Sequence, residues 1–248
     1  MPMRFIISPA KKMRVDTDSL PVFQLPVFLD KTNQLLEHLK SLSLSQCQSI
    51  WKCNDEIAQQ NYQRIQKMDL HKTLTPALLA YEGIQYQYMA PEVFTQEQLE
   101  YVQEHLRILS GFYGILRPMD GICPYRLEMQ SKLPDTYYKT LYQFWGDRLV
   151  DTLSKETDCL VNLASKEYSR CIQPYWPKEK RWIQISFGEL KDGKVVEKAT
   201  MSKMARGAMI RYAAEQNCAA PESLQGFCQF DFSFDPVRST ELHYIFIR

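Results

Sequence analysis

The strongest constraint on the fold is that short strand-like runs alternate along the chain with longer helical patterns. Residues 4–7, in which Phe5, Ile6 and Ile7 follow Arg4, look like a short strand, and 159–163 like a buried strand, while 182–187 alternates apolar and polar side chains. Leucines at helical spacing predict a helix over 29–42, followed by a shorter one over 45–53. Because glycine is scarce and no linker or repeat interrupts this order, we predict one α/β-type domain, residues 1–248, with a mixed sheet flanked by helices.

Local signals set further element boundaries. Asn54 can cap a helix that reaches Met68, and the capping box that begins at Thr95 predicts a helix ending at Gly111. Residues 78–89 read as a strand or strand pair, 135–153 as a helix interrupted near 146, and 202–216 as a late helix. An Asp-Gly turn at 192–193 predicts a hairpin, alternating phenylalanines at 230–234 favour a strand, and 242–247 closes the chain as another.

The loop expected over 10–26 is long and contains two prolines after the one at position 9. Long loops without secondary structure in compact domains are commonly functional, so this segment is a candidate part of a site.

Composition places the chain among ordinary globular proteins, with 45% hydrophobic and 24% charged residues. Only three large apolar residues stand together before Ser8, too few for a signal peptide or a membrane span. The seven cysteines are an odd number without close pairing, which is typical of reduced thiols. We therefore expect a cytoplasmic protein without a membrane partner.

The net charge of +1 conceals two segments of opposite sign. Residues 162–211 contain eleven basic and five acidic side chains, whereas 55–105 contain three basic and eight acidic ones. Any affinity for nucleic acid must therefore be local.

On the predicted helix over 202–216, Lys203, Arg206 and Arg211 fall opposite Ala205 and Ala208. One interpretation is a solvated polar face. The other is a phosphate site, because these cations have no acid among them and Gly207 leaves backbone bare in the same region.

Few known catalytic motifs are present. Ser8 and Lys11 have Ser-x-x-Lys spacing, but the partner motifs of penicillin-recognising enzymes are missing, so Lys11 is more readily an anion-binding group than an activator of Ser8. Phosphate-binding and dinucleotide-binding glycine motifs are absent. The four histidines are dispersed, and no zinc pattern occurs, so we predict no metal site and no cofactor.

Residues 105–118 run from the predicted capped helix into Gly-x-x-Gly. This arrangement is similar to the first half of a helix-hairpin-helix, whose hairpin amides contact a phosphate backbone; a tight helix-to-strand turn is the alternative. Arg117 and Arg126 follow among apolar residues, where an arginine is normally either paired, with Asp120 or Glu128 here, or kept for an anion.

Together these segments resemble the YaaA peroxide-stress family. The likeness covers 8–11, 105–118, 124–129, 144–146, 162–168, 203–207 and 246–248, in the family's order over nearly the whole chain. The resemblance implies a bacterial protein induced by hydrogen peroxide, linked to restraint of intracellular iron and to DNA protection. It also implies a family-specific mixed α/β fold that binds double-stranded DNA through a cationic cleft and a helix-hairpin-helix-like element.

The leading interpretation is a non-enzymatic protein that binds double-stranded DNA with little sequence specificity. Its anion-binding candidates are Lys11, Arg117, Arg126, Lys166, Lys203, Arg206 and Arg211. The alternative is an enzyme acting on a small anionic molecule, phosphorylated or bearing a nucleobase, in the same cleft. Its possible polar pocket comprises Ser8, Glu128, Asn162, Ser165 and Glu167. Direct iron binding is the least favoured, because clustered ligands are lacking.

Overall fold

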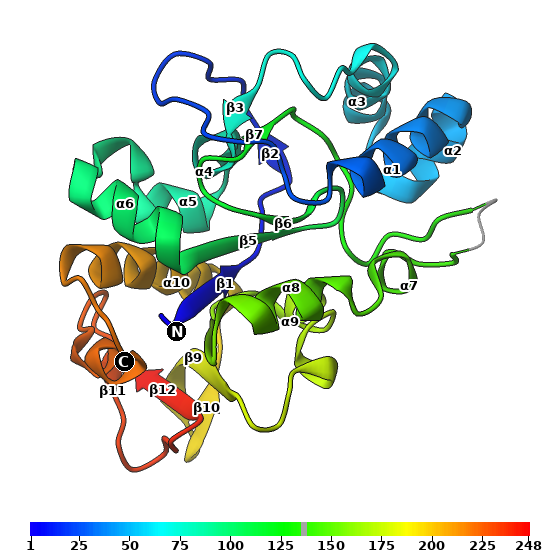
Figure 1. Ribbon diagram of the computed structural model, residues 1–248. Coiled ribbons are helices and arrows are strands. Elements are labelled where there is room, and N and C mark those ends of the chain that lie inside the picture. Colours follow the sequence, from blue (N-terminus) through cyan, green and yellow to red (C-terminus); the bar gives the residue numbers. More distant parts are fainter. Residues whose placement is uncertain (135–137) are drawn as a thin grey trace.

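The computed structural model describes residues 1–134 and 138–248, and within them a mixed sheet of eight strands forms the centre (Figure 1). Across the sheet the order is β11, β12, β9, β8, β1, β5, β6, and β10 pairs with β9. The bounds are β1 Arg4–Ile7, β5 Leu106–Ser110, β6 Gly114–Leu116, β8 Cys159–Asn162, β9 Arg181–Lys191, β10 Lys194–Val196, β11 Ser233–Phe234 and β12 His243–Ile247. The predicted mixed α/β class is confirmed.

The five inner strands β12, β9, β8, β1 and β5 run parallel, whereas β6, β10 and β11 pair antiparallel. All four residues of β1 are buried, as expected for a parallel strand covered on both faces. The strands predicted at 4–7 and 159–163 therefore lie side by side at the centre of the sheet.

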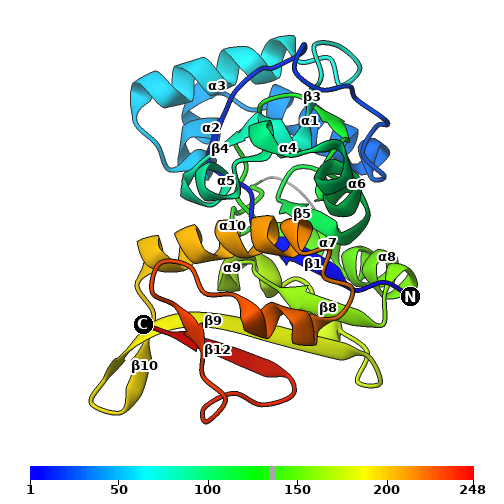
Figure 2. The ribbon, with the colours of Figure 1, turned by 90° about the vertical axis from the view of Figure 1, so that its left-hand side faces the viewer.

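Helices cover both faces of the sheet (Figure 2). On one side α10, Ala199–Glu215, contacts β9 and packs against α5, Ile84–Met89, and α6, Gln96–His105. On the other side lies α8, Arg148–Glu156, with α7, Leu141–Trp145, and α9, Lys166–Ser169, nearby (Figure 1). The predicted helices over 202–216 and 135–153 correspond to α10 and to α7 with α8; residues 135–137 lie outside the described part.

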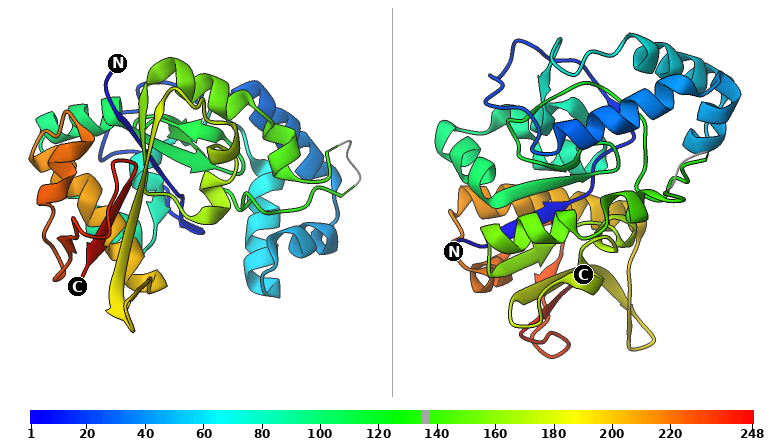
Figure 3. Two further views of the ribbon diagram at one scale, coloured as in Figure 1. Left: turned by 90° about the horizontal axis from the view of Figure 1, so that it is seen from below. Right: turned by 45° about the vertical axis from the view of Figure 1, so that its right-hand side comes forward.

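Three helices lie together at the opposite end of the molecule from β9 and β12 (Figures 1 and 3). They are α1 Leu29–Ser41, α2 Leu44–Trp51 and α3 Asp55–Lys67. Asn54 caps α3 by accepting from the amide of Ile57 at 3.0 Å, as predicted. The hydroxyl of Thr32 on α1 donates to the carbonyl of Phe112 and so ties this end of the molecule to the sheet.

Short elements fill the remaining connections. Strand β2, Lys12–Met13, pairs with β4, Tyr81–Glu82, and β3, Thr75–Pro76, pairs with β7, Gly121–Ile122. One further α-helix, α4, spans Ala77–Ala80, and 3-10 turns span Pro91–Val93, Gln173–Tyr175 and Pro221–Gly226. The long loop expected over 10–26 thus contains β2 and an isolated bridge at Gln24.

Two predicted strands are present only in part. Residues 78–89 form α4, the two-residue β4 and α5, because this apolar, aromatic segment is buried on several sides and its hydrophobicity does not discriminate helix from strand. Only Ser233 and Phe234 of the alternating 230–234 segment form a strand, since Phe230 and Asp231 adopt positive φ.

The expected helix-hairpin-helix is also wrong. The capping box at Thr95 does start α6, but that helix ends at His105, and the chain continues directly into β5. Gly111 and Gly114 then belong to a β-hairpin between β5 and β6, where Gly114 has a φ of +77°. The 106–110 segment, with Leu106, Ile108 and Leu109, is fully buried as a strand, and its sheet pairing overrides the helical periodicity.

The hairpin glycine nevertheless positions a later segment. A Cβ on Gly111 would lie 2.4 Å from the carbonyl oxygen of Leu127, so only glycine allows this close approach. Gly111 therefore fixes the backbone that carries Arg126 and Glu128.

Among the helices of the described residues, none is long and apolar enough to cross a bilayer.

Candidate functional site

A pocket of about 430 Å³ opens where β1 and β8 end. The segment after β1 contributes Ser8 and Lys11, and the segment after β8 contributes Ser165 and Glu167. The other walls come from α5, α10 and the chain between β7 and α7. Its polar lining residues are Ser8, Lys11, Lys12, Glu82, Gln85, Tyr86, Tyr125, Arg126, Glu128, Ser165, Glu167, Tyr168, Lys203 and Arg206.

The position of this pocket follows from the strand order. From β1 the chain continues to β5 on one side, whereas β8 lies on the other side of β1, so the direction of strand addition reverses there. In open parallel sheets, ligands bind outside the carboxyl ends of strands at such a reversal. The pocket therefore lies where this architecture places a binding site.

Two serines join the carboxyl ends of β1 and β8. The hydroxyl oxygen of Ser8 accepts from the amide of Ser165 at 2.8 Å and donates to its hydroxyl at 3.2 Å. The hydroxyl of Tyr86 on α5 donates to the carbonyl of Ser8 at 3.1 Å. Ser8 is thus held by Ser165, while the amine of Lys11 lies 2.9 Å from a Glu128 oxygen, so the Ser-x-x-Lys spacing does not form a serine-lysine pair.

Glu128 lies between two cations on the pocket wall. Its Oε2 pairs with Lys11 at 2.9 Å, and its Oε1 lies 3.5 Å from Nη2 of Arg126. Lys11 is 65% exposed at the rim, whereas Arg126 is 13% exposed and lies deeper. The Nε of Arg126 is buried and has no hydrogen-bond partner in the described part of the chain.

Helix α10 brings its own arginine to the pocket through a close helix contact. A Cβ on Gly207 would lie 2.0 Å from the carbonyl oxygen of Gln85, so glycine lets α10 touch the backbone of α5. Neighbouring Arg206 is 14% exposed and lies 3.7 Å from Glu197, and within residues 1–134 and 138–248 its buried Nε has no hydrogen-bond partner. Lys203, one turn earlier, is exposed at the rim.

The two deeper carboxyl groups interact electrostatically. Burial, together with the negative charge of Glu128, raises the pKa of Glu167, although the amide of Gln130 donates to it at 3.2 Å. A carboxyl group whose pKa is raised holds its proton more readily near neutral pH than an ordinary glutamate. Glu128 therefore lies close enough to Glu167 to affect its charge.

A buried chain of hydroxyls backs this wall. Tyr125 lies 2.9 Å from the hydroxyl of Tyr81 and 2.6 Å from that of Ser110, and burial raises its pKa to about 12. These tyrosines remain neutral hydrogen-bonding groups, which fix the wall beside Arg126.

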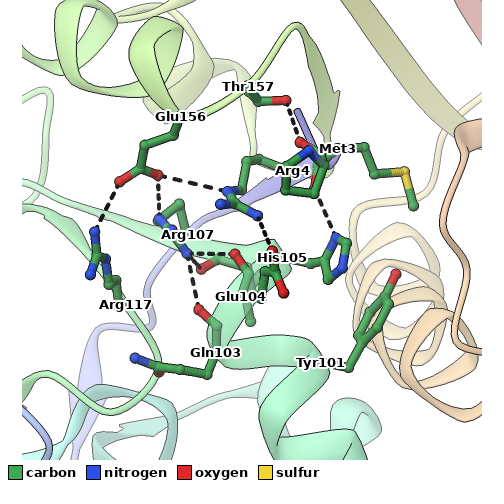
Figure 4. A network of polar contacts seen from close by, with 12 residues as sticks. Met3, Arg4, Tyr101, Gln103, Glu104, His105, Arg107, Arg117, Glu156 and Thr157 are labelled. Atoms are coloured by element: carbon green, nitrogen blue, oxygen red, sulfur yellow. Dashed lines mark hydrogen bonds and ion pairs between the residues drawn. The ribbon is translucent and has the colours of Figure 1, made fainter.

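Arg117 lies elsewhere, at the amino-terminal edge of the sheet (Figure 4). Its Nη2 is 3.3 Å from Glu156, the residue at the end of α8 that also pairs with Arg107 at 2.7 Å and Arg4 at 3.8 Å. This group of Arg4, Arg107, Arg117 and Glu156 is called the amino-edge cluster below. Arg117 is therefore separated from the pocket that contains Arg126.

Three further candidates also lie outside the pocket lining. Arg211 forms an i,i+4 ion pair with Glu215 at 2.7 Å, so an acid on the same helix neutralises it. Asn162 donates to Gln184 and accepts from the amide of Ala164, which shapes the turn after β8. Lys166 begins α9 beside Ser165 and Glu167. The pocket thus brings together Ser8, Lys11, Arg126, Glu128, Ser165, Glu167, Lys203 and Arg206.

Several lining residues could not be predicted from the sequence. Gln85, Tyr86 and Glu82 belong to the segment expected to form strands, and no charge pattern distinguishes Gln85 from other glutamines. Lys12 is adjacent to Lys11 in the long loop, so only the prediction that this loop belongs to a site pointed to Lys12.

Among the described residues, no group of three His, Cys, Asp or Glu side chains is arranged to hold a metal ion.

Comparison with known proteins agrees with the resemblance noted in the sequence. The chain is 53% identical over 246 residues to a UPF0246 protein of Lachnoclostridium phytofermentans, covering 99% of this chain and 96% of that protein. UPF0246 proteins of Agathobacter rectalis and Lactiplantibacillus plantarum are each 50% identical, with 99% of both chains covered. The family model for peroxide stress protein YaaA matches residues 3–238. The chain therefore belongs to the YaaA peroxide-stress family.

Proposed function

We propose that the protein binds the phosphate backbone of double-stranded DNA at the rim of this pocket, with little sequence specificity, as part of peroxide defence. The observation that carries this proposal is that five cationic side chains from three separate segments surround one pocket: Lys11, Lys12, Arg126, Lys203 and Arg206. Three carboxylates accompany them, so the surroundings remain net positive.

The rim lysines are the groups that a duplex can reach. Lys11 and Lys12 are largely exposed, and Lys203 is exposed one turn along α10. Lysine amines on flexible stems contact phosphates without reading bases, which supports affinity without sequence preference. Lys166, which begins α9 next to Glu167, extends the same rim in this proposal.

The test measures binding of a short duplex at several salt concentrations by fluorescence anisotropy. The double variant Lys12→Glu/Lys203→Glu should weaken binding at least tenfold, and the salt slope should fall by about 0.9 for each phosphate that is no longer neutralised. Lys191→Glu/Lys194→Glu, in the hairpin of β9 and β10, is the matched control, because it changes two exposed lysines that do not line the pocket. Binding without a salt slope, or equal binding by the double variant, contradicts the proposal.

Protection from iron follows from the same interactions with phosphate. Phosphates of DNA hold a condensed layer of cations, and a protein that neutralises phosphates releases them. Fe²⁺ ions held in that layer would be released with the others, away from the strands that peroxide chemistry would otherwise break. Nicking of plasmid DNA by Fe²⁺ and hydrogen peroxide should be reduced by the native protein and not by the double variant.

A second candidate is an enzyme acting on a small phosphorylated or nucleobase-containing substrate. It is favoured by the pocket volume, which lies in the range of small-molecule sites, and by two neighbouring carboxyl groups, Glu128 and Glu167, of which burial raises the pKa of Glu167. Incubation of the purified protein with a metabolite extract should then consume one compound. Loss of that turnover in Glu167→Gln would support the assignment, and an unchanged extract would contradict it.

A further inference from the structure

Three buried donors of the pocket have no acceptor. They are Nε of Arg126, Nε of Arg206 and Nε2 of Gln85, each without a hydrogen-bond partner in the part of the chain that the structure describes. They come from three separate elements: the chain after β7, helix α10 and helix α5. All three residues line the pocket.

Such donors are rarely left alone in folded proteins. A buried polar group without a partner is unfavourable, and more so when it is charged. Gln85 is 7% exposed, and the two guanidinium groups are 13% and 14% exposed, so water is largely removed from them. An acceptor that enters the pocket would compensate all three.

We infer that the floor of the pocket is an oxyanion site that takes a small molecule through a phosphate group. The two guanidinium groups have donors only, and the carboxamide of Gln85 adds an unpartnered N–H donor, which together form the kind of set that oxyanions prefer. Lys203 adds positive charge at the rim and has no ion-pair partner among the described residues.

Size favours a small molecule over the backbone of a duplex at these donors. A volume of about 430 Å³ accommodates a ligand of nucleotide size or smaller. Phosphates of a duplex lie on a convex surface and reach protruding lysines first, whereas the three donors lie behind that rim. The inference shares its pocket with the small-substrate candidate above, but it requires binding only and not turnover.

The test uses the full chain and isothermal titration calorimetry with four probes: inorganic phosphate, adenosine 5′-monophosphate, ribose 5-phosphate and unphosphorylated adenosine. We expect saturable binding of one or more phosphorylated probes, at least tenfold tighter than adenosine. If adenosine binds as well as every phosphorylated probe, or if none of the four binds, the inference is wrong.

Gln85→Glu is the diagnostic variant. It keeps the shape of the side chain and replaces an unpartnered donor with a carboxylate oxygen, which repels an oxyanion. Affinity for the phosphorylated probe should fall at least tenfold. Gln63→Glu makes an equal change of charge at an exposed position of α3 and should leave the affinity within twofold. Arg126→Lys, which keeps the charge and removes Nε, provides a second variant if Gln85→Glu unfolds at a lower temperature.

The duplex assay separates this inference from the DNA proposal. Gln85→Glu should keep duplex binding within threefold, because the rim lysines are unchanged. If the variant loses duplex binding and the native protein binds no small probe, the donors serve the DNA backbone and the small-molecule inference is overturned. If small probes bind and the duplex does not, the inference stands and the DNA proposal fails.

Discussion

Arginines lie at both edges of the central sheet, but their hydrogen-bond partners differ. At the amino edge, Arg107 is 3% exposed, donates to three backbone carbonyls and pairs with Glu156 at 2.7 Å. At the carboxyl edge, Arg126 and Arg206 retain buried Nε atoms with no hydrogen-bond partner within the described residues. Arg107 is therefore held by partners within the fold, whereas the unpartnered donors of Arg126 and Arg206 belong to residues that line the pocket.

The amino edge also has unpartnered donors, because Nε and Nη1 of Arg4 are buried without a hydrogen-bond partner among the described residues. What distinguishes the two regions is that Arg126 and Arg206 line the pocket, whereas Arg4, Arg107 and Arg117 do not line it. The amino-edge cluster gathers three guanidinium groups on one carboxylate, and Arg4 lies 3.8 Å from both Glu104 and Glu156 (Figure 4). The Glu156 carboxylate is 18% exposed, so water could only poorly compensate the three arginines if this carboxylate were removed. Replacing Glu156 should therefore affect folding, while replacing Glu128 at the pocket should affect binding.

The largest expected effect is on Glu156. Glu156→Gln leaves Arg107 buried without its carboxylate, and we expect the free energy of unfolding to fall by about 3–5 kcal/mol. Glu128→Gln should cost less than about 1 kcal/mol, because its closest partner, Lys11, is largely exposed. Urea unfolding of both variants checks the contrast, and equal losses would remove the distinction between the two edges.

A pH-dependent effect sharpens the description of the amino edge. Burial raises the pKa of Asp120 to about 6, although its oxygens accept from Gln24 and from the amide of Arg117 at 2.8 Å each. A pKa raised from 3.8 stabilises the folded state below about pH 4, and this contribution is lost as the pH rises through 6. The loss is about 3 kcal/mol.

Asp120→Asn tests this dependence. The side chain at position 120 of the variant cannot ionise. Between pH 4 and pH 7 the native protein should therefore lose unfolding free energy relative to the variant. Denaturant titrations at a series of pH values measure it, and a difference that stays constant over this range would contradict the assignment.

A smaller effect is expected where the carboxyl edge is assembled. Gly207→Ala places a methyl group against the carbonyl of Gln85, which must move α5 away from α10, at a cost of about 1–3 kcal/mol. Affinity for the phosphorylated probe should fall as well, since Gln85 and Arg206 separate. Ala208→Gly, which loosens the same helix without adding atoms, is the control for helix propensity.

The smallest effect should come from Lys203. Lys203→Gln removes an exposed charge without an ion-pair partner in residues 1–134 and 138–248, so stability should change by less than about 0.5 kcal/mol. Duplex affinity should nevertheless fall. A thermal melt and a binding curve on the same sample separate the two effects, and a large change in the melt would mean that this lysine is structural.

The sequence predicted those parts of the fold that depend on local pattern. Strand β1, strand β8 and the caps at Asn54 and Thr95 lie where apolar runs and side-chain oxygens placed them. Helix α6 was extended too far, because 106–110 has apolar residues that suit either a helix or a strand until the pairing with β1 decides. A local sequence pattern does not show which strands will pair in the folded protein.

The sequence predicted which types of residue form the candidate site, but less well which individual residues line it. Arg117 and Arg126 look alike in the sequence, and what separates them is Glu156, 39 positions beyond Arg117, which meets only the first. Gln85 could not be identified, because a neutral amide becomes informative only when its burial and its missing acceptor are known.

Gly111 has a consequence for how this pocket can change over time. Its missing side chain allows the β5–β6 hairpin to press on the backbone of 127–129, so the wall that carries Arg126 is set by a residue that touches no ligand. A larger residue at position 111 would displace that wall while every charged group stayed in place. Relatives could thus acquire a differently shaped pocket, and a different preference among ligands, through one change behind the site.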